Sequence, residues 1–298
     1  MFPIIPANSA AADSGNSEGI FGFGYNDASG NLSMTNLVSN AGVVASDVAG
    51  VGTAKNSSAA TEYGGDKGIF SSTSSTQYTN LVSNTGVVAS DVAGVGTQRS
   101  VLAGCAYGGD KGIFGFGGSF LSMTNLVSNA GVVASDTAGV GMARKGPAAT
   151  EYGGDKGIFG YGYTAVAPHY VSITNLVSNA GVVSTDVAGV GTARYSLAAC
   201  GYGSDKGIFG YGHMGADVST TNLISNVGVV ASDVAGVGTA RSFTAACEYG
   251  GDKGIFGYGG TGPGWVSITN LVSNTGVVAS DVAGVGADRG AIAACSFN

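Results

Sequence analysis

The residues of this chain that could do chemistry are two histidines, four cysteines and a set of repeated aspartates, lysines and arginines. Zinc sites take three or four protein ligands, whereas His169 and His213 supply only two imidazoles. They stand in successive copies of a repeat and could approach one another, but we expect both in exposed loops. No Ser-His-Asp or Cys-His arrangement can be built, and the Gly-rich segments are not followed by helices, as phosphate-binding loops are. The sequence therefore predicts a protein that is not an enzyme and needs no cofactor.

The cysteines all occupy one equivalent position of the repeat: Cys105, Cys200, Cys247 and Cys295. Thr61 and Thr150 stand there in the other two copies. No Cys-X-X-Cys or Cys/His spacing typical of a metal site is present. Equivalent positions in different repeats are expected to lie farther apart than the roughly 7 Å between Cα atoms that a disulfide allows. We expect small structural thiols near the inner wall of the fold, with a disulfide or a ring of metal ligands as alternatives.

Charged residues also recur at fixed places. One basic position holds, in five copies, Arg99, Arg144, Arg194, Arg241 and Arg289, and Lys55 takes the sixth place. Eight residues before each of these stands Asp47, Asp91, Asp136, Asp186, Asp233 or Asp281. A second pair, Asp66-Lys67, recurs at Asp110, Asp155, Asp205 and Asp252. Because catalytic groups usually break symmetry, we interpret these residues as structural ion pairs rather than a ring of sites, and bidentate Arg-carboxylate contacts would fix the register of neighbouring units.

Composition excludes several functions. The net charge is −7, and the basic residues form no cluster of the kind that binds a phosphate backbone, so we expect no nucleic acid partner. No stretch of about 18 apolar residues occurs, so we expect no membrane insertion. The opening residues, MFPIIPANSAAADSG, lack the basic and long apolar regions of a secretory signal. We expect residues 1–17 to form a flexible arm and residues 18–298 to form the folded domain.

Six near-identical repeats make up almost the whole chain. The pair Thr-Asn that opens TNLVSN or TNLISN recurs six times, and each of the first five copies is followed by a GIF tripeptide after 33 residues. From each GIF to the next Thr-Asn the insert varies between 8 and 14 residues. A strand in a hydrogen-bonded ladder cannot gain a residue without a bulge or a slip in register, whereas a surface loop lengthens at little cost. The constant part is therefore predicted to be sheet and tight turn, and the variable part a loop.

Turn signals such as Gly-Gly-Asp and Ala-Gly-Val-Gly separate short runs rich in Val, Ile, Phe and Tyr, which predicts four strands in each unit. The two ends of the chain are out of phase with the repeat. After its arm the chain begins at a second strand, Glu18-Gly-Ile-Phe, and it ends with a first strand that starts at Ala291. Joined, the two ends complete one unit. Propellers remove exposed edges by such radial closure. The sequence thus predicts an all-β, closed six-bladed β-propeller of four-stranded antiparallel blades, in which the C-terminal strand completes the first blade.

The variable loops carry what distinguishes one repeat from another. Each follows the same strand of its unit, so all six are expected to project from one face, and loops on a rigid scaffold are common sites of recognition. Aromatic and other large side chains are concentrated in the loops of three consecutive units: Tyr163, His169, Tyr170, His213, Met214 and Trp265. Such anchors suit a protein contact or the face of a sugar, although shielding of the blade tops explains them as well.

The run Gly238 to Gly260, GTARSFTAACEYGGDKGIFGYGG, resembles a kelch repeat: a basic residue, a strand of small residues, a Gly-rich turn and an aromatic strand that ends in glycine. The likeness covers about half of each unit and implies a β-propeller. The chain departs from kelch repeats in lacking a tryptophan late in the unit, since Trp265 is its single tryptophan and stands in a variable loop. Copper chemistry of the galactose-oxidase kind, known in one kelch branch, needs more histidines than this chain has.

The phrases YGGDKGIFGYG and TNLVSNTGVVASDVAGVGTAR resemble repeats of tail-associated proteins of aquatic bacteriophages, including those of cyanobacteria. This likeness covers almost the whole chain. It implies a structural virion protein, associated with the tail or a fibre and assembled in the host cytoplasm. The arm would then dock onto other virion proteins, and the loop face would meet a glycan or receptor of the host surface during attachment. The alternative is a lectin-like propeller that binds a glycan or receptor without being part of a virion.

Overall fold

The computed structural model describes residues 16–73 and 75–298, and in these residues the chain is all-β, without helices. Six antiparallel sheets hold the strands of the repeats. The first two sheets consist of β21 (Ala293–Phe297), β1 (Glu18–Gly22) and β4 (Thr35–Val38), and of β5 (Ala60–Tyr63), β6 (Lys67–Phe70), β7 (Tyr78–Val82) and β8 (Val92–Ala93). The next two consist of β9 (Ala103–Tyr107), β10 (Lys111–Gly115) and β11 (Thr124–Val127), and of β12 (Ala148–Tyr152), β13 (Lys156–Tyr163) and β14 (Tyr170–Val177).

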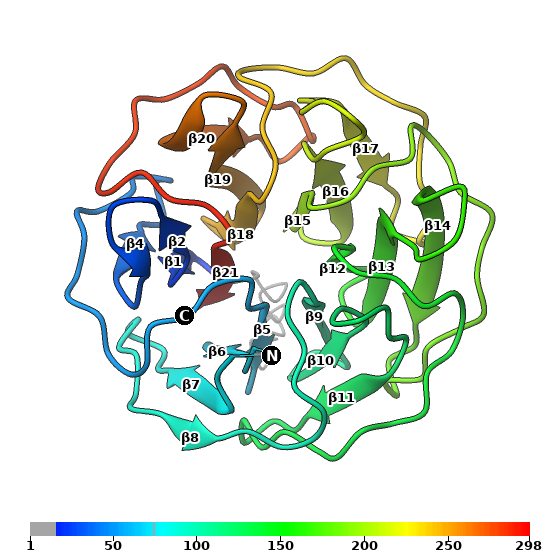
Figure 1. Ribbon diagram of the computed structural model, residues 1–298, viewed down its shortest axis with the longest axis horizontal. Coiled ribbons are helices and arrows are strands. Elements are labelled where there is room, and N and C mark those ends of the chain that lie inside the picture. The colour runs from blue at the N-terminus through cyan, green and yellow to red at the C-terminus, as the bar shows by residue number, and fades with distance from the viewer. Residues whose placement is uncertain (1–15, 74) are drawn as a thin grey trace, which may run out of the picture.

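The last two consist of β15 (Ala198–Tyr202), β16 (Lys206–Gly210) and β17 (Thr221–Ile224), and of β18 (Ala245–Tyr249), β19 (Lys253–Thr261) and β20 (Gly264–Val272). A small seventh sheet pairs β2 (Tyr25–Asn26) with β3 (Gly30–Asn31). The sheets surround a common centre in a β-propeller-like arrangement (Figure 1). The strands nearest the centre, which we call the inner strands, contact one another in the order β5, β9, β12, β15, β18 and β21, and β21 contacts β5.

The two ends of the chain share one sheet, as predicted. Strand β21 pairs antiparallel with β1, with Phe297 opposite Glu18 and Cys295 opposite Ile20. The predicted arm falls mainly on residues 1–15, which lie outside the described residues. Its last two residues are bound to the fold: Asn16 is buried, and the Ser17 amide donates to the Asn298 carbonyl at 2.9 Å.

The predicted fourth strand of each unit is wrong for five of the six sheets, because only β8 forms such a strand. In the other units the outer segment makes isolated bridges, such as Thr35 with Val48 and Val38 with Val44. The second sheet differs by one further residue pair, since Tyr78 pairs with Ala93 beside the pair of Thr79 and Val92. An asparagine amide binds the outer segment in either case: Asn36 Nδ2 donates to the Ala45 carbonyl and to Asp47, and Asn80 makes the equivalent bonds beside β8.

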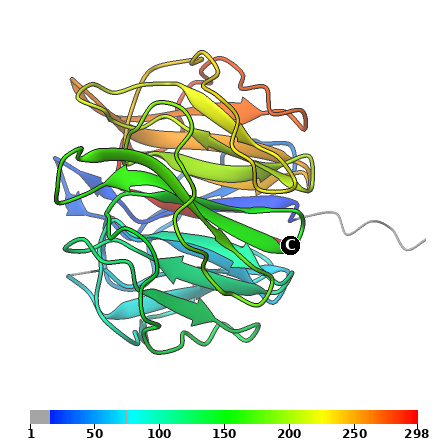
Figure 2. The same ribbon diagram turned by 90° about the vertical axis from the view of Figure 1, so that its right-hand side faces the viewer.

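Each inner strand has two ends, and these define two faces of the molecule, which lie on opposite sides in Figure 2. The variable loops belong to the face at the start of the inner strands, which we call the loop face. The Asp-Lys turns follow the inner strands on the other side, which we call the turn face.

On the loop face, six residues that each precede an inner strand are joined by backbone hydrogen bonds of 2.7–3.0 Å. They are Ser57, Val101, Gly146, Ser196, Phe243 and Ala291. Each amide donates to the carbonyl of the member of this set in the preceding repeat. The amide of Ser57 donates to the carbonyl of Ala291, which closes the set. All six have φ between 51° and 62°, a left-handed conformation that costs a non-glycine residue roughly 1 kcal/mol or more. The mutual hydrogen bonds hold this unfavourable backbone in place.

Cysteine and glycine pack against each other between neighbouring sheets. The four cysteines are buried and free, which confirms the expectation of structural thiols. A Cβ added at Gly254 would lie 2.5 Å from the Sγ of Cys200, and one at Gly19 would lie 2.5 Å from the Sγ of Cys247. Glycine therefore recurs in the GIF tripeptide because a cysteine, or at Gly112 and Gly207 a threonine, of the preceding sheet fills the space of its missing side chain.

We expect Gly254→Ala to destabilise the protein by about 1–3 kcal/mol, since an added methyl group overpacks the contact with Cys200. The matched control is Gly262→Ala, because no atom lies within 4 Å of a Cβ there. Thermal unfolding measures both variants. Removing the thiol in Cys200→Ala/Gly254→Ala should recover part of the loss. Equal melting temperatures for the two single variants would contradict this packing.

Candidate functional site

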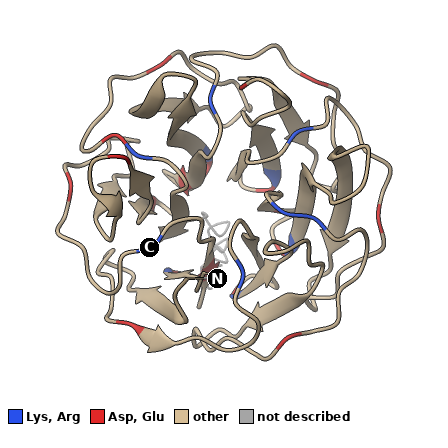
Figure 3. Ribbon diagram, in the orientation of Figure 1, with Lys and Arg blue, Asp and Glu red and all other residues tan. Residues whose placement is uncertain are grey.

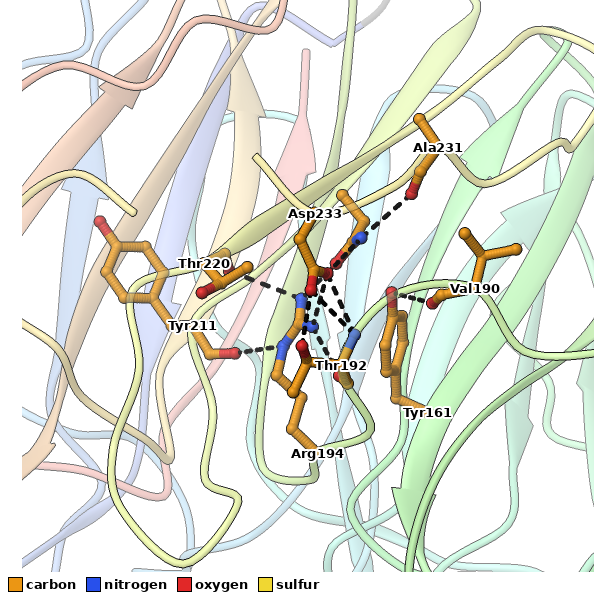
Figure 4. A network of polar contacts seen from close by, with 9 residues as sticks. Tyr161, Val190, Thr192, Arg194, Tyr211, Thr220, Ala231 and Asp233 are labelled. Atoms are coloured by element: carbon orange, nitrogen blue, oxygen red, sulfur yellow. Dashed lines mark hydrogen bonds and ion pairs between the residues drawn. The ribbon is translucent and has the colours of Figure 1, made fainter. Parts of the chain in front are cut away.

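The repeated arginines lie in buried polar networks (Figure 4). Arg194 is fully buried, and its guanidinium donates to the carbonyls of Tyr211 at 2.8 Å and Thr192 at 3.0 Å. A further nitrogen donates to Asn222 Oδ1 at 2.7 Å, and the group lies 4.5 Å from the centre of the Tyr161 ring in the preceding sheet. Burial lowers the pKa of Arg194, but an arginine stays charged at neutral pH. The network therefore joins two sheets and is structural.

The predicted partnership of these arginines with the aspartate series is found, but it is not bidentate. Arg99, Arg194, Arg241 and Arg289 each bring one nitrogen to 3.4–4.0 Å from a carboxylate oxygen. The partner of Arg194 is Asp233, which belongs to the next repeat rather than standing eight residues upstream. Its oxygens already accept hydrogen bonds from Thr192 and Asn222, and this explains the long single contact. Figure 3 shows one series of acidic residues along the rim, with the basic residues and the other acidic residues nearer the centre.

The second sheet departs from this pattern. Lys55 replaces arginine there and donates from Nζ to the carbonyls of Ser71 and Tyr78 and to Asn80 Oδ1. Burial lowers the pKa of Lys55 to about 7. That sheet also has serine where its neighbours have a buried ring, and a cavity of about 20 Å³ lies beside Arg99. Nε and Nη1 of Arg99 have no hydrogen-bond partner within the described part of the chain.

The turn face surrounds a cavity of about 240 Å³ at one end of a central channel. Glu62, Glu151 and Glu248 line it, and they stand on alternate inner strands, β5, β12 and β18. The sequence analysis missed these residues, although the signal is visible: Glu precedes the Tyr of the Tyr-Gly-Gly-Asp-Lys turn in every second repeat. Successive side chains of a strand point to opposite faces. Because the preceding Thr or Cys points into the contact between neighbouring sheets, the glutamate side chain points toward the centre of the molecule.

These carboxyl groups are poorly solvated. Desolvation, with the charges of Glu62 and Asp155 adding to it, raises the pKa of Glu151 to about 8. Desolvation also raises the pKa of Glu62 and Glu248. Glu62 accepts a hydrogen bond from the Ser296 amide at 3.2 Å, whereas Glu151 has no hydrogen-bond partner among the described residues. No group of three or more His, Cys, Asp and Glu in the described residues is arranged to hold a metal ion.

Two of the Asp-Lys pairs, Asp110-Lys111 and Asp205-Lys206, line the same cavity. In each of the five pairs the lysine and its neighbouring aspartate form an ion pair, as the sequence predicts. The aspartate also accepts from an asparagine of the same sheet, as Asp205 does from Asn226 at 3.0 Å. Its carbonyl accepts from the turn glycine of the preceding sheet, for instance from Gly153 at 2.8 Å. These charges are paired, so they fix the turns rather than form a free charged surface.

The loop face carries a connected series of aromatic side chains, which we call the aromatic arc. Its members are Tyr25, Phe120, Tyr163, His169, Tyr170, Tyr195, His213, Phe243 and Trp265. Tyr195 is central, with ring centroids 5.3 Å from Tyr163 and 6.4 Å from Phe243. Phe243 continues to Trp265 at 6.4 Å, and Trp265 to Tyr25 at 6.0 Å. The arc therefore runs through the loops of five of the six sheets.

Five of the six predicted binding residues lie in the aromatic arc. His169 stacks on Tyr163 at 5.2 Å and 9°, and His213 packs edge-on against Tyr195. Met214 is 40% exposed and makes no ring contact that would place it in the arc. The sequence analysis missed Tyr195 and Phe243, which stand outside the variable loops, one residue after Arg194 and two residues after Arg241. The available signal was an aromatic residue at a position where the other copies have none.

The charged side chains beside the arc are held by contacts with its rings. Lys145 lies 5.1 Å from the centre of the Phe120 ring and 5.5 Å from that of Tyr163. Asp217 pairs with His213 at 2.9 Å, and Asp27 accepts from the indole of Trp265 at 3.3 Å. The arc presents flat apolar ring faces with polar edges, which suits a neutral ligand that has both apolar and hydroxyl-bearing sides.

At the inner border of the arc, a hollow of about 60 Å³ lies within the hydrogen-bonded set of six left-handed residues. Phe243 belongs both to the arc and to the wall of this hollow. Three of the lining residues, Ser58, Ser196 and Thr244, have side-chain oxygens that are shielded from solvent and have no hydrogen-bond partner among the described residues. The loop face thus offers an aromatic surface next to a small recess.

Comparison with known proteins identifies no relative: no protein-family model and no curated protein matches the chain. The part of the chain that the structure describes contains no apolar helix of membrane-spanning length.

Proposed function

We propose that the chain is a closed six-bladed β-propeller and acts as a non-enzymatic recognition platform that binds a cell-surface carbohydrate through its loop face. Support for closure comes from the sheet that β21 shares with β1 and from the six backbone hydrogen bonds that return from Ser57 to Ala291. A second set, on the turn face, runs from turn to turn and ends where Asn298 donates to the Asp66 carbonyl. A closed scaffold holds the loops rigidly, which lowers the entropy that binding costs.

The aromatic arc is the observation that carries the recognition function. Its rings are partly exposed and are fixed by contact with one another, so they lose little freedom when a ligand covers them. Nothing in the repeat requires these side chains, since the equivalent positions differ between copies: Tyr195, for example, stands where other copies have Ser100, Lys145 or Gly290. Departures from a symmetric pattern are where a specific function is expected, because the symmetric positions serve the scaffold.

We expect the double variant Tyr195→Ala/Trp265→Ala to bind its glycan at least about tenfold more weakly for each ring removed, since one well-placed aromatic contact contributes about 1.4 kcal/mol or more. A glycan array identifies the ligand, and titration calorimetry measures the affinities. Tyr78→Ala is the matched control, because Tyr78 is 42% exposed but lies outside the arc. Circular dichroism checks folding. Equal binding by the double variant, or a wild-type protein that binds no glycan, would contradict the proposal.

We propose further that the protein serves on a phage virion, associated with the tail or a fibre. The resemblance of its repeats to those of tail-associated proteins supports this setting. The two faces fit it: Asn16 lines the turn-face cavity, at the opposite end of the inner strands from the aromatic arc. An arm that leaves the turn face to dock on other virion proteins would leave the loop face free for the host.

A further inference from the structure

One lysine of the loop face, Lys145, deepens the carbohydrate-binding function proposed above, on which this inference rests. The chain has 12 lysines and arginines, of which six stand at the repeated arginine position and five in the Asp-Lys pairs, and Lys145 is the remaining one. The other copies have, at its position, Asn56, Ser100, Tyr195, Ser242 and Gly290. A charge that occurs in a single copy is not required by the scaffold, which all copies share.

The backbone and the ammonium group of Lys145 are both held in place. The Lys145 amide donates to the Tyr163 carbonyl at 2.9 Å, and the Tyr163 amide donates back to the Lys145 carbonyl at 2.8 Å. The Nζ atom lies 5.1 Å from the centre of the Phe120 ring and 5.5 Å from that of Tyr163. Because the face of an aromatic ring attracts a cation, these two rings fix the ammonium at the Phe120 end of the aromatic arc.

The charge of this ammonium is not balanced by a carboxylate. Lys145 forms no ion pair with the described residues, whereas the lysine of every Asp-Lys pair does. The acidic side chains beside the arc contact other rings, since Asp217 pairs with His213 and Asp27 accepts from Trp265. A lysine ammonium has three hydrogen-bond donors, and contact with ring faces leaves them available to an anion. Lys145 is partly exposed, so a ligand on the arc can reach it.

We propose that Lys145 binds the carboxylate of a uronic acid unit of the glycan, while neutral units of the same glycan lie on the rest of the aromatic arc. In a uronic acid the carboxylate is attached directly to the sugar ring. A ring that packs on Tyr163 therefore brings its carboxylate to the border of the same side chain, where Nζ donates a charge-assisted hydrogen bond to it. The net charge of −7 repels anions in general, so a preference for an acidic sugar has to come from a local cation.

Titration of the full chain with the methyl glycosides of glucuronic acid, galacturonic acid, glucose and galactose tests this assignment. Each acidic sugar differs from its parent only at the C6 group. We expect at least one acidic sugar to bind about fivefold more tightly than its parent, as a partly exposed ion pair allows. The preference should shrink in about 1 M salt, because salt screens an exposed ion pair.

Three variants locate the carboxylate. In Lys145→Met, which keeps an unbranched side chain but removes the charge, the preference for the acidic sugar should disappear while the affinity for glucose and galactose stays the same. Lys145→Arg keeps the charge and should keep the preference. Lys253→Met is the matched control, because it changes the net charge equally but Lys253 belongs to an Asp-Lys turn of the opposite face. It should keep the preference as well.

Equal or weaker binding of the acidic sugars overturns the uronic acid site but leaves the carbohydrate-binding function intact. Binding of none of the four sugars overturns both proposals. A preference that survives in Lys145→Met, or that Lys253→Met removes equally, places the origin of the preference outside Lys145 and also overturns the assignment. Melting temperatures of the variants, measured alongside, show that each one is folded when it is titrated.

Discussion

A chain that ends at residue 290 is expected to lose its cooperative fold, and a peptide of residues 291–298 added in trans is expected to restore it. The missing strand buries Ile292, Cys295 and Phe297, and each large apolar side chain contributes about 1.5–3 kcal/mol on burial. Its loss also leaves β1 without a partner on its inner side and opens the loop-face hydrogen-bonded set at Ala291. Together these losses are comparable with the whole stability of an ordinary domain, about 5–15 kcal/mol.

Circular dichroism and gel filtration measure the folding of the truncated chain with and without the peptide. The control keeps every strand and moves the ends: a circular permutant that links Asn298 to Asn16 and opens between Gly262 and Pro263, which are exposed. It should fold, because Ser17 and Asn298 are already hydrogen-bonded to each other. A truncated chain that melts like the full one would show that the last strand does not seal a ring.

The second large effect concerns pH. We expect the protein to lose stability between about pH 4.5 and pH 8, because the pKa of Glu151 rises from an ordinary value of 4.5 to about 8 on folding. The folded state then binds more protons than the unfolded state over this range. The stabilising effect of the protonated carboxyl is therefore fully present below pH 4.5 and is lost as the pH rises through 8. The raised pKa values of Glu62 and Glu248 act in the same direction.

Glu151→Gln should remove much of this pH dependence. The amide resembles the protonated carboxyl, so the variant should match the native protein near pH 4.5 and exceed its stability by about 1–3 kcal/mol at pH 9. Denaturant unfolding at both pH values measures the difference. Glu18→Gln is the control, because Glu18 lies on β1 and does not line the channel cavity. A variant less stable than the native protein at pH 9 would show that the ionised carboxylate is stabilising.

Residues that recur in every repeat and residues that occur in only some repeats have different roles in this protein. The arginine networks, the GIF glycines and the Asp-Lys turns recur because each sheet meets its neighbour in the same way. The aromatic arc, the glutamates on alternate inner strands and the unpartnered hydroxyls of Ser58, Ser196 and Thr244 break that symmetry. The proposed recognition function rests on the aromatic arc, and the pH effect follows from the glutamates.

Insertions are confined to one segment of each repeat. Their positions in the sequence were enough to distinguish the strands from the variable loops. The folded part of the chain begins at Glu18 with the second strand of a repeat and ends, from Ala291, with a first strand. This was enough to predict that the last strand joins the first sheet, since a strand without a neighbour leaves its backbone unpaired. Four strands per unit could not be predicted correctly from composition. Whether the outer segment counts as a strand depends on how far its pairing continues beyond a single bridge, as it does from Thr79 and Val92 to Tyr78 and Ala93, and side-chain alternation does not reveal this.

What the sequence by itself determined was local: the repeat frame, the turns, the variable loops and the inner strands, all of which follow from spacing and side-chain alternation. Only the tertiary structure decided which distant residues meet. It brought Tyr195 between Tyr163 and Phe243, placed Glu151 in the channel with Glu62, and paired Arg194 with Asp233 of the next repeat. The physical reason is that these contacts depend on the curvature with which sheets pack around a centre, and no spacing along the chain encodes that curvature directly.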